Sequence, residues 1–190
     1  MLNLKTLILS NNLISKLESD VFKDLISLTY LSLKNNNLSL IEPDYFDGLI
    51  NLVKLDLNGC NINKINLGSF ENLKILDLGN NKITFFSQNL SSLTELYLTN
   101  NPLRNLTYPM VNFKNSNLET LGISECQLKF VDFDILRNYP LRFLGIAGNS
   151  FDFNNETFIG FKYLKKVKVN LNDADRLNLM FPNIIFNNTI

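Results

Sequence analysis

The stretch Leu52-Val53-Lys54-Leu55-Asp56-Leu57-Asn58-Gly59-Cys60-Asn61-Ile62 decides the fold of this chain. Counted from Leu52, its apolar residues fall at positions 1, 4, 6 and 11, and a small hydrogen-bonding residue stands at position 9. The spacing recurs along the chain, and we number positions within every copy in this way. Eight copies begin near residues 4, 28, 52, 73, 93, 118, 141 and 164. Eight copies in register predict a single repetitive domain over residues 1–190.

This spacing is a known repeat signature, and through it the chain resembles the leucine-rich repeat family over nearly its whole length. The resemblance implies an α/β-type solenoid in the shape of a horseshoe. A parallel β-sheet would line the concave face, and loops with short 3-10 or helical turns would form the convex face. Residues from about 181 onward read as a partial ninth copy, with one more strand.

Positions 3 to 7 of each copy alternate with period 2, which predicts a short strand. Leucines at positions 4 and 6 point into the core, and the residues at positions 3, 5 and 7 face outward. Position 9 turns the chain away from the strand, where a buried Asn can bond otherwise unpaired backbone groups. Stacked copies should therefore form a ladder of Asn12, Asn36, Asn81, Asn101, Asn149 and Asn172.

Two copies carry cysteine at position 9, namely Cys60 and Cys126. They are three copies apart, so strands spaced about 4.8 Å place them roughly 14 Å apart. A disulfide needs a Cα separation below about 7 Å. We therefore predict two free, buried thiols.

Phenylalanine marks the second half of the early copies, at Phe22, Phe46 and Phe70. Such copies resemble the typical extracellular repeats of Toll-like receptors and related animal ectodomains, and these rings should fill the convex-side core. Extracellular members of the family commonly carry cysteine-rich caps, and neither end here has a cysteine cluster. We expect a fragment of a longer array, with self-association through its uncapped ends.

Composition excludes several functions. Lys plus Arg equals Asp plus Glu, at 18 each, which argues against a nucleic-acid partner. No apolar run approaches the roughly 20 residues of a membrane span, and no signal peptide is recognisable. Without histidine, and without a glycine-rich phosphate loop, the chain offers no catalytic or cofactor residues. The pairs Asp132/Asp134 and Asp173/Asp175 lack further oxygen ligands for calcium, so no metal is predicted.

What remains is the outward face of the strands, which the core does not need. Asp56, Asp77 and Glu95 should make an acidic centre, relieved only by Lys54. Gly122, Gly145 and Ala147 should leave a shallow floor beside Phe143 and Tyr97, where a partner's bulky side chain could settle. The far end of this face should be basic. A solvated face with drifting sequence is the alternative to a protein-binding wall. The predicted partner-binding residues are Tyr30, Lys54, Asp56, Ile75, Asp77, Glu95, Tyr97, Phe143, Lys166 and Lys168.

The compartment is decided only weakly by the sequence. Candidate N-glycosylation sequons occur at Asn37, Asn89, Asn105, Asn155 and Asn187. None falls on an outward strand position of the eight copies, which favours an extracellular chain with a glycan-free concave face. The missing signal peptide and the missing cysteine-rich caps favour a cytoplasmic chain.

The sequence therefore predicts a non-catalytic protein-recognition module that binds a protein ligand or co-receptor as part of a receptor or adhesion ectodomain. An intracellular scaffold or regulatory array of the same fold is the first alternative. The substrate-recruiting domain of an enzyme whose catalytic part lies elsewhere is the second.

Overall fold

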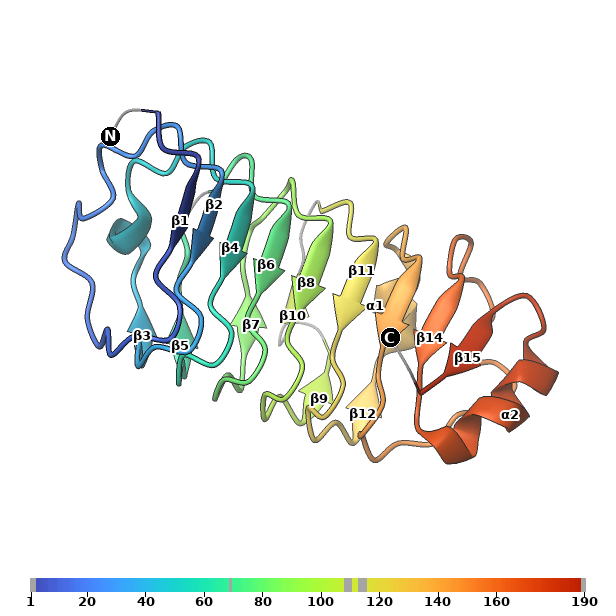
Figure 1. Ribbon diagram of the computed structural model, residues 1–190. Coiled ribbons are helices and arrows are strands. Elements are labelled where there is room, and N and C mark those ends of the chain that lie inside the picture. The colour runs from blue at the N-terminus through green and yellow to red at the C-terminus, as the bar shows by residue number, and fades with distance from the viewer. Residues whose placement is uncertain (1–2, 69, 108–110, 113–115, 189–190) are drawn as a thin grey trace.

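The computed structural model describes residues 3–68, 70–107, 111–112 and 116–188. Its main feature is a nine-stranded sheet in the order β1-β2-β4-β6-β8-β11-β13-β14-β15. Every pairing in it is parallel. The strands lie side by side along one face of an elongated molecule (Figure 1). They are β1 Thr6–Ile8, β2 Tyr30–Ser32, β4 Lys54–Asp56, β6 Ile75–Asp77, β8 Glu95–Tyr97, β11 Thr120–Gly122, β13 Phe143–Gly145, β14 Lys166–Lys168 and β15 Ile185–Asn187.

The register of this sheet is the predicted one. Each strand covers positions 3 to 5 of its copy, and position 3 pairs with position 3 of the next copy, as in Lys54 with Ile75 and Ile75 with Glu95. The middle residue of each central strand is buried and its two neighbours are half-buried. The ninth strand also forms, because Phe186 of β15 packs into the core at 2% exposure. The α/β leucine-rich repeat solenoid is confirmed.

The opposite wall contains short elements between the strands of the main sheet. The structure has a 3-10 turn, η1 (Pro43–Phe46), and two helices, α1 (Phe133–Arg137) and α2 (Leu171–Met180). It also has two-residue parallel pairs that the sequence did not predict. They are β3 Leu40–Ile41 with β5 Lys64–Ile65, β7 Phe86–Ser87 with β10 Val111–Asn112, and β9 Asn105–Leu106 with β12 Phe130–Val131.

Aromatic rings fill the convex side of the core, as predicted. Phe22, Phe46 and Phe70 are buried. The Phe22 and Phe46 rings stack with centroids 6.4 Å apart, and the Phe46 and Phe70 centroids are 5.9 Å apart. Because each ring contacts the ring of the next copy, the core is a continuous row along the solenoid and not a single globule.

The asparagine ladder forms in the middle of the chain. Oδ1 of Asn81 accepts from the N–H groups of Cys60 and Ile62, at 3.0 and 2.9 Å. Its Nδ2 donates to three carbonyls, those of Leu57, Leu78 and Gly79. One buried side chain therefore satisfies five backbone groups in two coils. Asn36, Asn101 and Asn149 make bonds of the same kind.

Two members of the predicted ladder differ from the prediction. Asn172 lies in α2 with an exposed side chain, because the last coil leaves β14 as a helix and not as a turn. Asn12 bonds the carbonyls of Leu9 and Ser10 but is exposed, since no described coil packs on its outer side. In α2, Asn178 instead bonds both backbone groups of Phe186, at 2.9 and 3.0 Å. That pair covers part of the β15 edge, which would otherwise be open.

Position 8 has a requirement of its own. Asn11, Asn35, Asn80, Asn100 and Glu125 occupy it with φ between 54° and 57°. Only Gly and, less readily, Asn adopt this left-handed conformation at low cost. The exposed side chains also bond one another, from Asn35 to Asn11 and from Asn100 to Asn80. The repeated Asn-Asn pair therefore has two separate tasks, a left-handed turn and a buried rung.

The first coil differs from those that follow it. Leu4, Leu7 and Leu9 are only partly buried, whereas Leu28 and Leu31 of the second copy are fully buried. The first coil therefore leaves apolar side chains partly exposed at this end, and self-association through it stays a prediction. None of the helices in the described part of the chain has the length and apolarity that a membrane span requires.

Candidate functional site

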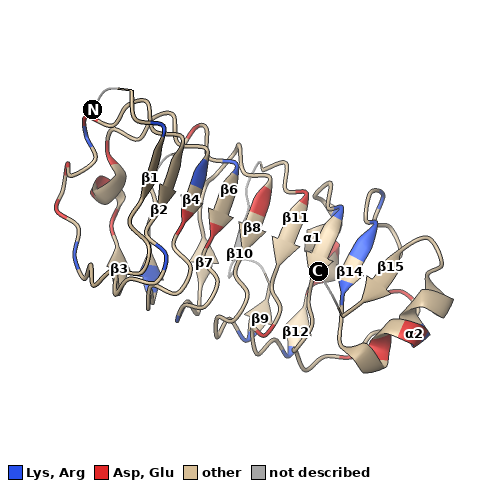
Figure 2. Ribbon diagram, viewed as in Figure 1, with Lys and Arg blue, Asp and Glu red and all other residues tan. Residues whose placement is uncertain are grey.

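The ten predicted binding residues share one face of the molecule. They stand at positions 3 and 5 of adjacent strands, and each is half-buried. Figure 2 shows acidic residues on β4, β6 and β8 and basic residues on β14. The predicted separation of charge along the sheet is therefore present in the structure, although the residues come from copies spread over more than 130 positions of sequence.

We call Asp56, Asp77 and Glu95 the acidic centre. Asp56 accepts from the N–H of Asn58, in the turn after β4, at 3.1 Å and from the Ser32 hydroxyl at 3.3 Å. Asp77 accepts from the Gly79 N–H at 2.9 Å and from the Asn58 amide at 3.1 Å. The two aspartates are thus held in place by bonds within and between coils. The sequence did not reveal the Ser32 and Asn58 side-chain partners, because they depend on which residue the neighbouring coil brings alongside.

Lys54 was the one cation expected to relieve the acidic centre. Its ammonium group instead lies over the Tyr30 ring, 5.0 Å from the centroid. A cation over an aromatic face is attracted by the electrons of the ring. In the described part of the chain, no ion pair involves a residue of the acidic centre. Its three carboxylates therefore remain available to a cation from outside.

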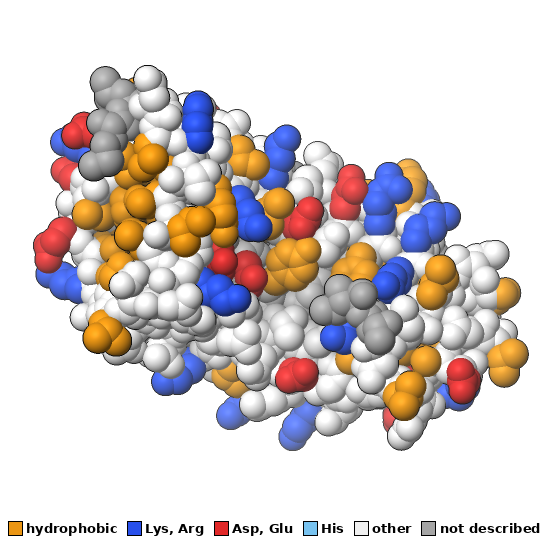
Figure 3. Space-filling view, in the orientation of Figure 1, with side chains coloured by type: hydrophobic (Ala, Val, Ile, Leu, Met, Phe, Trp, Pro, Cys, Tyr) orange, Lys and Arg blue, Asp and Glu red, His pale blue; other side chains and the backbone are white. Residues whose placement is uncertain are grey.

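Beside the acidic centre lies a pocket of about 290 Å³, which we call the hollow. Its floor is Gly122 and Gly145, which pair in neighbouring strands. Its walls include Tyr97, Phe143, Lys166 and Lys168. Figure 3 shows hydrophobic side chains near the middle of this face, between acidic and basic ones. The expected shallow floor exists, except that Ala147 does not line it: Ala147 is buried, and Ser124 and Thr99 take part instead.

The missing side chains of the two glycines create this space. A Cβ atom on Gly122 would lie 3.1 Å from the Tyr97 ring and 3.3 Å from the Thr99 hydroxyl. A Cβ on Gly145 would lie 3.3 Å from the Ser124 hydroxyl and 3.5 Å from the Phe143 ring. Neither glycine is at a turn, and glycine in a strand interior costs roughly 0.5–1 kcal/mol relative to alanine. In a strand it often marks a place where a ligand approaches closely.

Tyr97 joins the hollow to the acidic centre. Its hydroxyl donates to Oε2 of Glu95 at 2.9 Å. Burial, then the hydrogen bond and charge of Glu95, and then the charge of Asp77, raise the pKa of Tyr97 to about 12. The phenol is therefore protonated at physiological pH and acts as a fixed hydrogen-bond donor with its ring over Gly122.

The two cysteines are free and buried, as predicted. Each thiol donates to a carbonyl of the preceding coil, Cys60 to Leu33 and Cys126 to Leu98, both at 3.1 Å. Burial raises the pKa of the Cys60 thiol, and it raises that of Cys126 to about 11. Because the thiolate is the reactive form, neither cysteine is suited to nucleophilic or redox chemistry.

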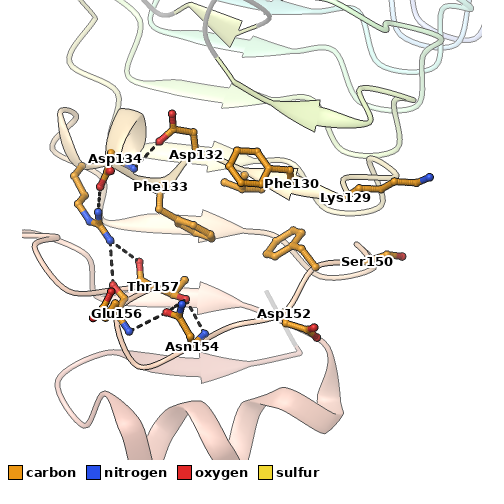
Figure 4. A pocket seen from close by; sticks show the side chains of 13 residues that line it. Lys129, Phe130, Asp132, Phe133, Asp134, Ser150, Asp152, Asn154, Glu156 and Thr157 are labelled. Carbon is orange, nitrogen blue, oxygen red and sulfur yellow. Dashed lines mark hydrogen bonds and ion pairs between the residues drawn. The ribbon is translucent and has the colours of Figure 1, made fainter.

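A second groove, of about 530 Å³, lies on the other wall between α1 and residues 150–157 (Figure 4). Its polar groups serve local structure. Asp132 accepts from two N–H groups as the N-cap of α1, and Asp134 pairs with Arg137. Arg137 also donates to the carbonyls of Glu156 and Thr157. These bonds explain the Asp132/Asp134 pair without calcium.

In the other acidic pair, Asp173 has a structural explanation. Asp173 stands in the first turn of α2 and pairs with Arg176 at 3.2 Å. Across the residues that the structure describes, no group of three or more Cys, Asp or Glu side chains is placed to hold a metal ion.

The sequons divide into two sets. Asn37, Asn89, Asn105 and Asn155 are exposed and lie outside the nine-stranded sheet. Asn187, however, belongs to β15 and pairs with Lys168 of β14. It therefore stands on the concave face, and the prediction that this face lacks sequons is wrong for the ninth strand.

Comparison with known proteins agrees with this architecture. A family model described as "Leucine rich repeat" matches residues 3–62 and 50–103. The crystal structure of internalin C2 from Listeria monocytogenes is similar, with 26% identity and a TM-score of 0.67 over 89% of this chain and 72% of that one. The leucine-rich repeat domain of APL1B is similar in fold, with 22% identity and a TM-score of 0.59. That likeness covers 83% of this chain and about half of the other, 52%. No curated protein matches the sequence.

Proposed function

The chain belongs to the leucine-rich repeat family, and we propose that it recognises a protein ligand through the acidic centre and the hollow of its concave face. Domains of this family typically act as non-catalytic interaction modules. The observation that carries the proposal is the pair of strand glycines, Gly122 and Gly145, in register beneath Tyr97 and Phe143. A solenoid coil does not need glycine there, because other copies carry Asp56, Asp77 or Tyr97 at the same position.

The two aromatic walls support a role in binding. Tyr97 and Phe143 are half-buried, and both border an open pocket. Aromatic side chains in pockets near the centre of an interface often contribute most of the binding free energy. In this chain they stand between fixed carboxylates and two lysines, so a partner would gain apolar and ionic contacts together.

The test uses the double variant Asp77→Ala with Tyr97→Ala. We expect the affinity for a protein partner to fall by several kcal/mol, because an aromatic anchor and a charge are lost together. Isothermal titration calorimetry with the intact chain measures this loss. Phe130→Ala is the matched control, since Phe130 is an aromatic of the other wall with 56% of its surface exposed. Unchanged affinity of the double variant would move the binding site away from the concave face.

Within this function we propose an extracellular setting, as part of a receptor or adhesion ectodomain. Four exposed sequons off the sheet and the Phe-bearing typical repeats support it. An intracellular scaffold of the same fold is the alternative. A mobility shift of secreted protein after glycosidase treatment supports the first setting, and absence of glycan on Asn37, Asn89, Asn105 and Asn155 supports the second.

A further inference from the structure

We propose that the partner presents a linear segment whose wall-facing side chains run in the order basic, bulky apolar, acidic. This inference rests on the proposed function and states what the same face would select. It follows from three features that lie in line across the strands. These are the acidic centre on β4, β6 and β8, the hollow over β11 and β13, and Lys166 and Lys168 on β14.

Charge complementarity sets the two ends of the segment. Lys54 is drawn to the Tyr30 ring, so Asp56, Asp77 and Glu95 form a negative patch without an internal counter-ion among the described residues. The same holds for Lys166 and Lys168, which are in no ion pair of the described chain. A segment with charges of one sign would be repelled at one of the two patches. Phosphate-rich nucleic acid would meet the acidic centre and is disfavoured for the same reason.

The hollow sets the middle of the segment. Its volume of about 290 Å³ is slightly smaller than that of pockets that enclose drug-sized ligands, which is roughly 300–1,000 Å³. It therefore suits one inserted side chain. Its walls, Tyr97 and Phe143, favour an aromatic or large aliphatic group.

The spacing of the strands sets the distances between the three side chains. Neighbouring strands are about 4.8 Å apart, so β6 and β14, four steps apart in the sheet, are separated by roughly 19 Å. An extended chain advances about 3.3 Å per residue, and alternate side chains face the same way. About six residues therefore connect the basic and acidic groups, and the apolar residue falls about four residues from the basic one. All three side chains then face the sheet together.

The rim of the hollow offers bonds for the backbone of such a segment. The hydroxyls of Thr99 and Thr120 border the hollow. Among the described residues, neither hydroxyl makes a hydrogen bond to the protein. A main chain lying across the strands could donate to them or accept from them, and the specificity would remain with the three side chains.

The experiment measures fluorescence anisotropy of labelled seven-residue peptides with the intact chain. Two ordered probes are used. The first has Lys at position 1, Phe at position 5 and Glu at position 7, with Gly and Ser elsewhere, and the second has the same sequence in reverse. The control peptide has the same composition with Lys and Glu side by side. We expect one of the ordered probes to bind at least tenfold more tightly than the control. Replacement of its Phe by Gly should reduce binding at least tenfold, because a buried aromatic contact is lost.

Paired substitutions assign each charge to its patch. Asp77→Asn keeps the side-chain oxygen that accepts from Gly79 but removes the charge, and should weaken the Lys-bearing peptide about threefold. The same variant should not weaken a peptide with Gln in place of Lys. Lys168→Gln should likewise weaken binding of the Glu-bearing peptide about threefold. It should not weaken binding of a peptide with Gln in place of Glu. Gly145→Val should abolish peptide binding, because the larger side chain fills the hollow. Circular dichroism checks that this variant is folded. The control Phe130→Ala should leave peptide affinity unchanged.

Two results would overturn the inference. One is equal binding of the ordered and control peptides. The other is no detectable binding of any ordered probe at millimolar concentration. If a protein partner still loses affinity in the Asp77→Ala/Tyr97→Ala variant, the proposed function stands and the face binds a folded surface instead of a linear segment. If the partner is also unaffected, both proposals fail.

Discussion

The acidic centre and the hollow are neighbouring parts of one sheet, but they follow the rules of the repeat to different degrees. The turns after β6 and β8 contain Asn80-Asn81 and Asn100-Asn101. In each pair the first Asn adopts the left-handed conformation and the second is a buried member of the asparagine ladder. The coil of β4 keeps a suitable left-handed residue, Gly59, but has Cys60 in place of the buried Asn. The coil of β11 turns with Glu125-Cys126, which suits neither task. It also begins the pair of strand glycines.

This difference is informative because every coil of a solenoid has the same structural task. A coil that departs from the best local chemistry has either drifted or has a second task. In the hollow, Gly122 of β11 and Gly145 of β13 leave one continuous pocket between two aromatic rings. The acidic centre shows the opposite arrangement, with carboxylates fixed by hydrogen bonds to their neighbours. One part of the face offers room, and the other offers fixed charge.

The largest effect is expected for the buried rungs. Asn81→Ala should lower the free energy of unfolding by about 2–3 kcal/mol, because five backbone groups lose their partner. Cys126→Ala should cost only about 1 kcal/mol, since a thiol donates weakly and has no amide oxygen. Urea denaturation of both variants measures the contrast. Equal losses would mean that the rungs of the two regions are equivalent.

A smaller gain in stability is expected at the turn behind the hollow. Glu125 has φ of 56°, a conformation that costs an ordinary residue roughly 1–2 kcal/mol. Glu125→Asn should therefore stabilise the chain by about 0.5–1 kcal/mol, because Asn tolerates this conformation better. The matched variant in the acidic centre, Asn80→Ala, should destabilise by a similar amount. Both values come from thermal or urea unfolding, and a loss of stability in Glu125→Asn would contradict the account of position 8.

The smallest effect concerns the Tyr97 phenol, which joins the two regions. Its folded pKa of about 12 exceeds the ordinary value of 10.0. Burial and the bond to Glu95 both favour the protonated phenol, so their contribution to stability is full below about pH 10 and is lost as the pH rises toward 12. Ultraviolet titration should show one tyrosine ionising late, and Tyr97→Phe should remove that step.

Gly122→Ala sharpens this last test. The new methyl group would lie 3.1 Å from the Tyr97 ring, so the ring must shift by a few tenths of an ångström. We expect this shift to weaken the hydrogen bond to Glu95 and the pKa of Tyr97 to fall toward 10. Gly145→Ala is the control, because its contacts at 3.3 and 3.5 Å involve other side chains. An unchanged Tyr97 pKa in Gly122→Ala would show that the ring position does not depend on the glycine.

Much of the fold could be predicted because the repeat is local. The leucines at positions 4 and 6 specify strand, face and register within a dozen residues, and the structure reproduces that register in all eight copies. The thiols were placed correctly for the same reason. The prediction failed where one coil took another form. Asn172 entered α2 because Ala174 and Leu177 can bury the helix against the last coil. Asn187 reached the concave face because the ninth strand pairs fully with β14.

The sequence by itself determined which residues face the concave side, since period-2 alternation and the repeat length assign a face to each strand residue. It therefore determined the charges and the glycines of that face. Only the tertiary structure decided what those residues do to one another. Neighbouring strands place Lys54 over Tyr30, bring the Asn58 amide to Asp77 and leave the hollow open above Gly122. Those contacts join residues about 20 to 45 positions apart. Packing across neighbouring strands fixes them, and no local sequence pattern encodes that packing.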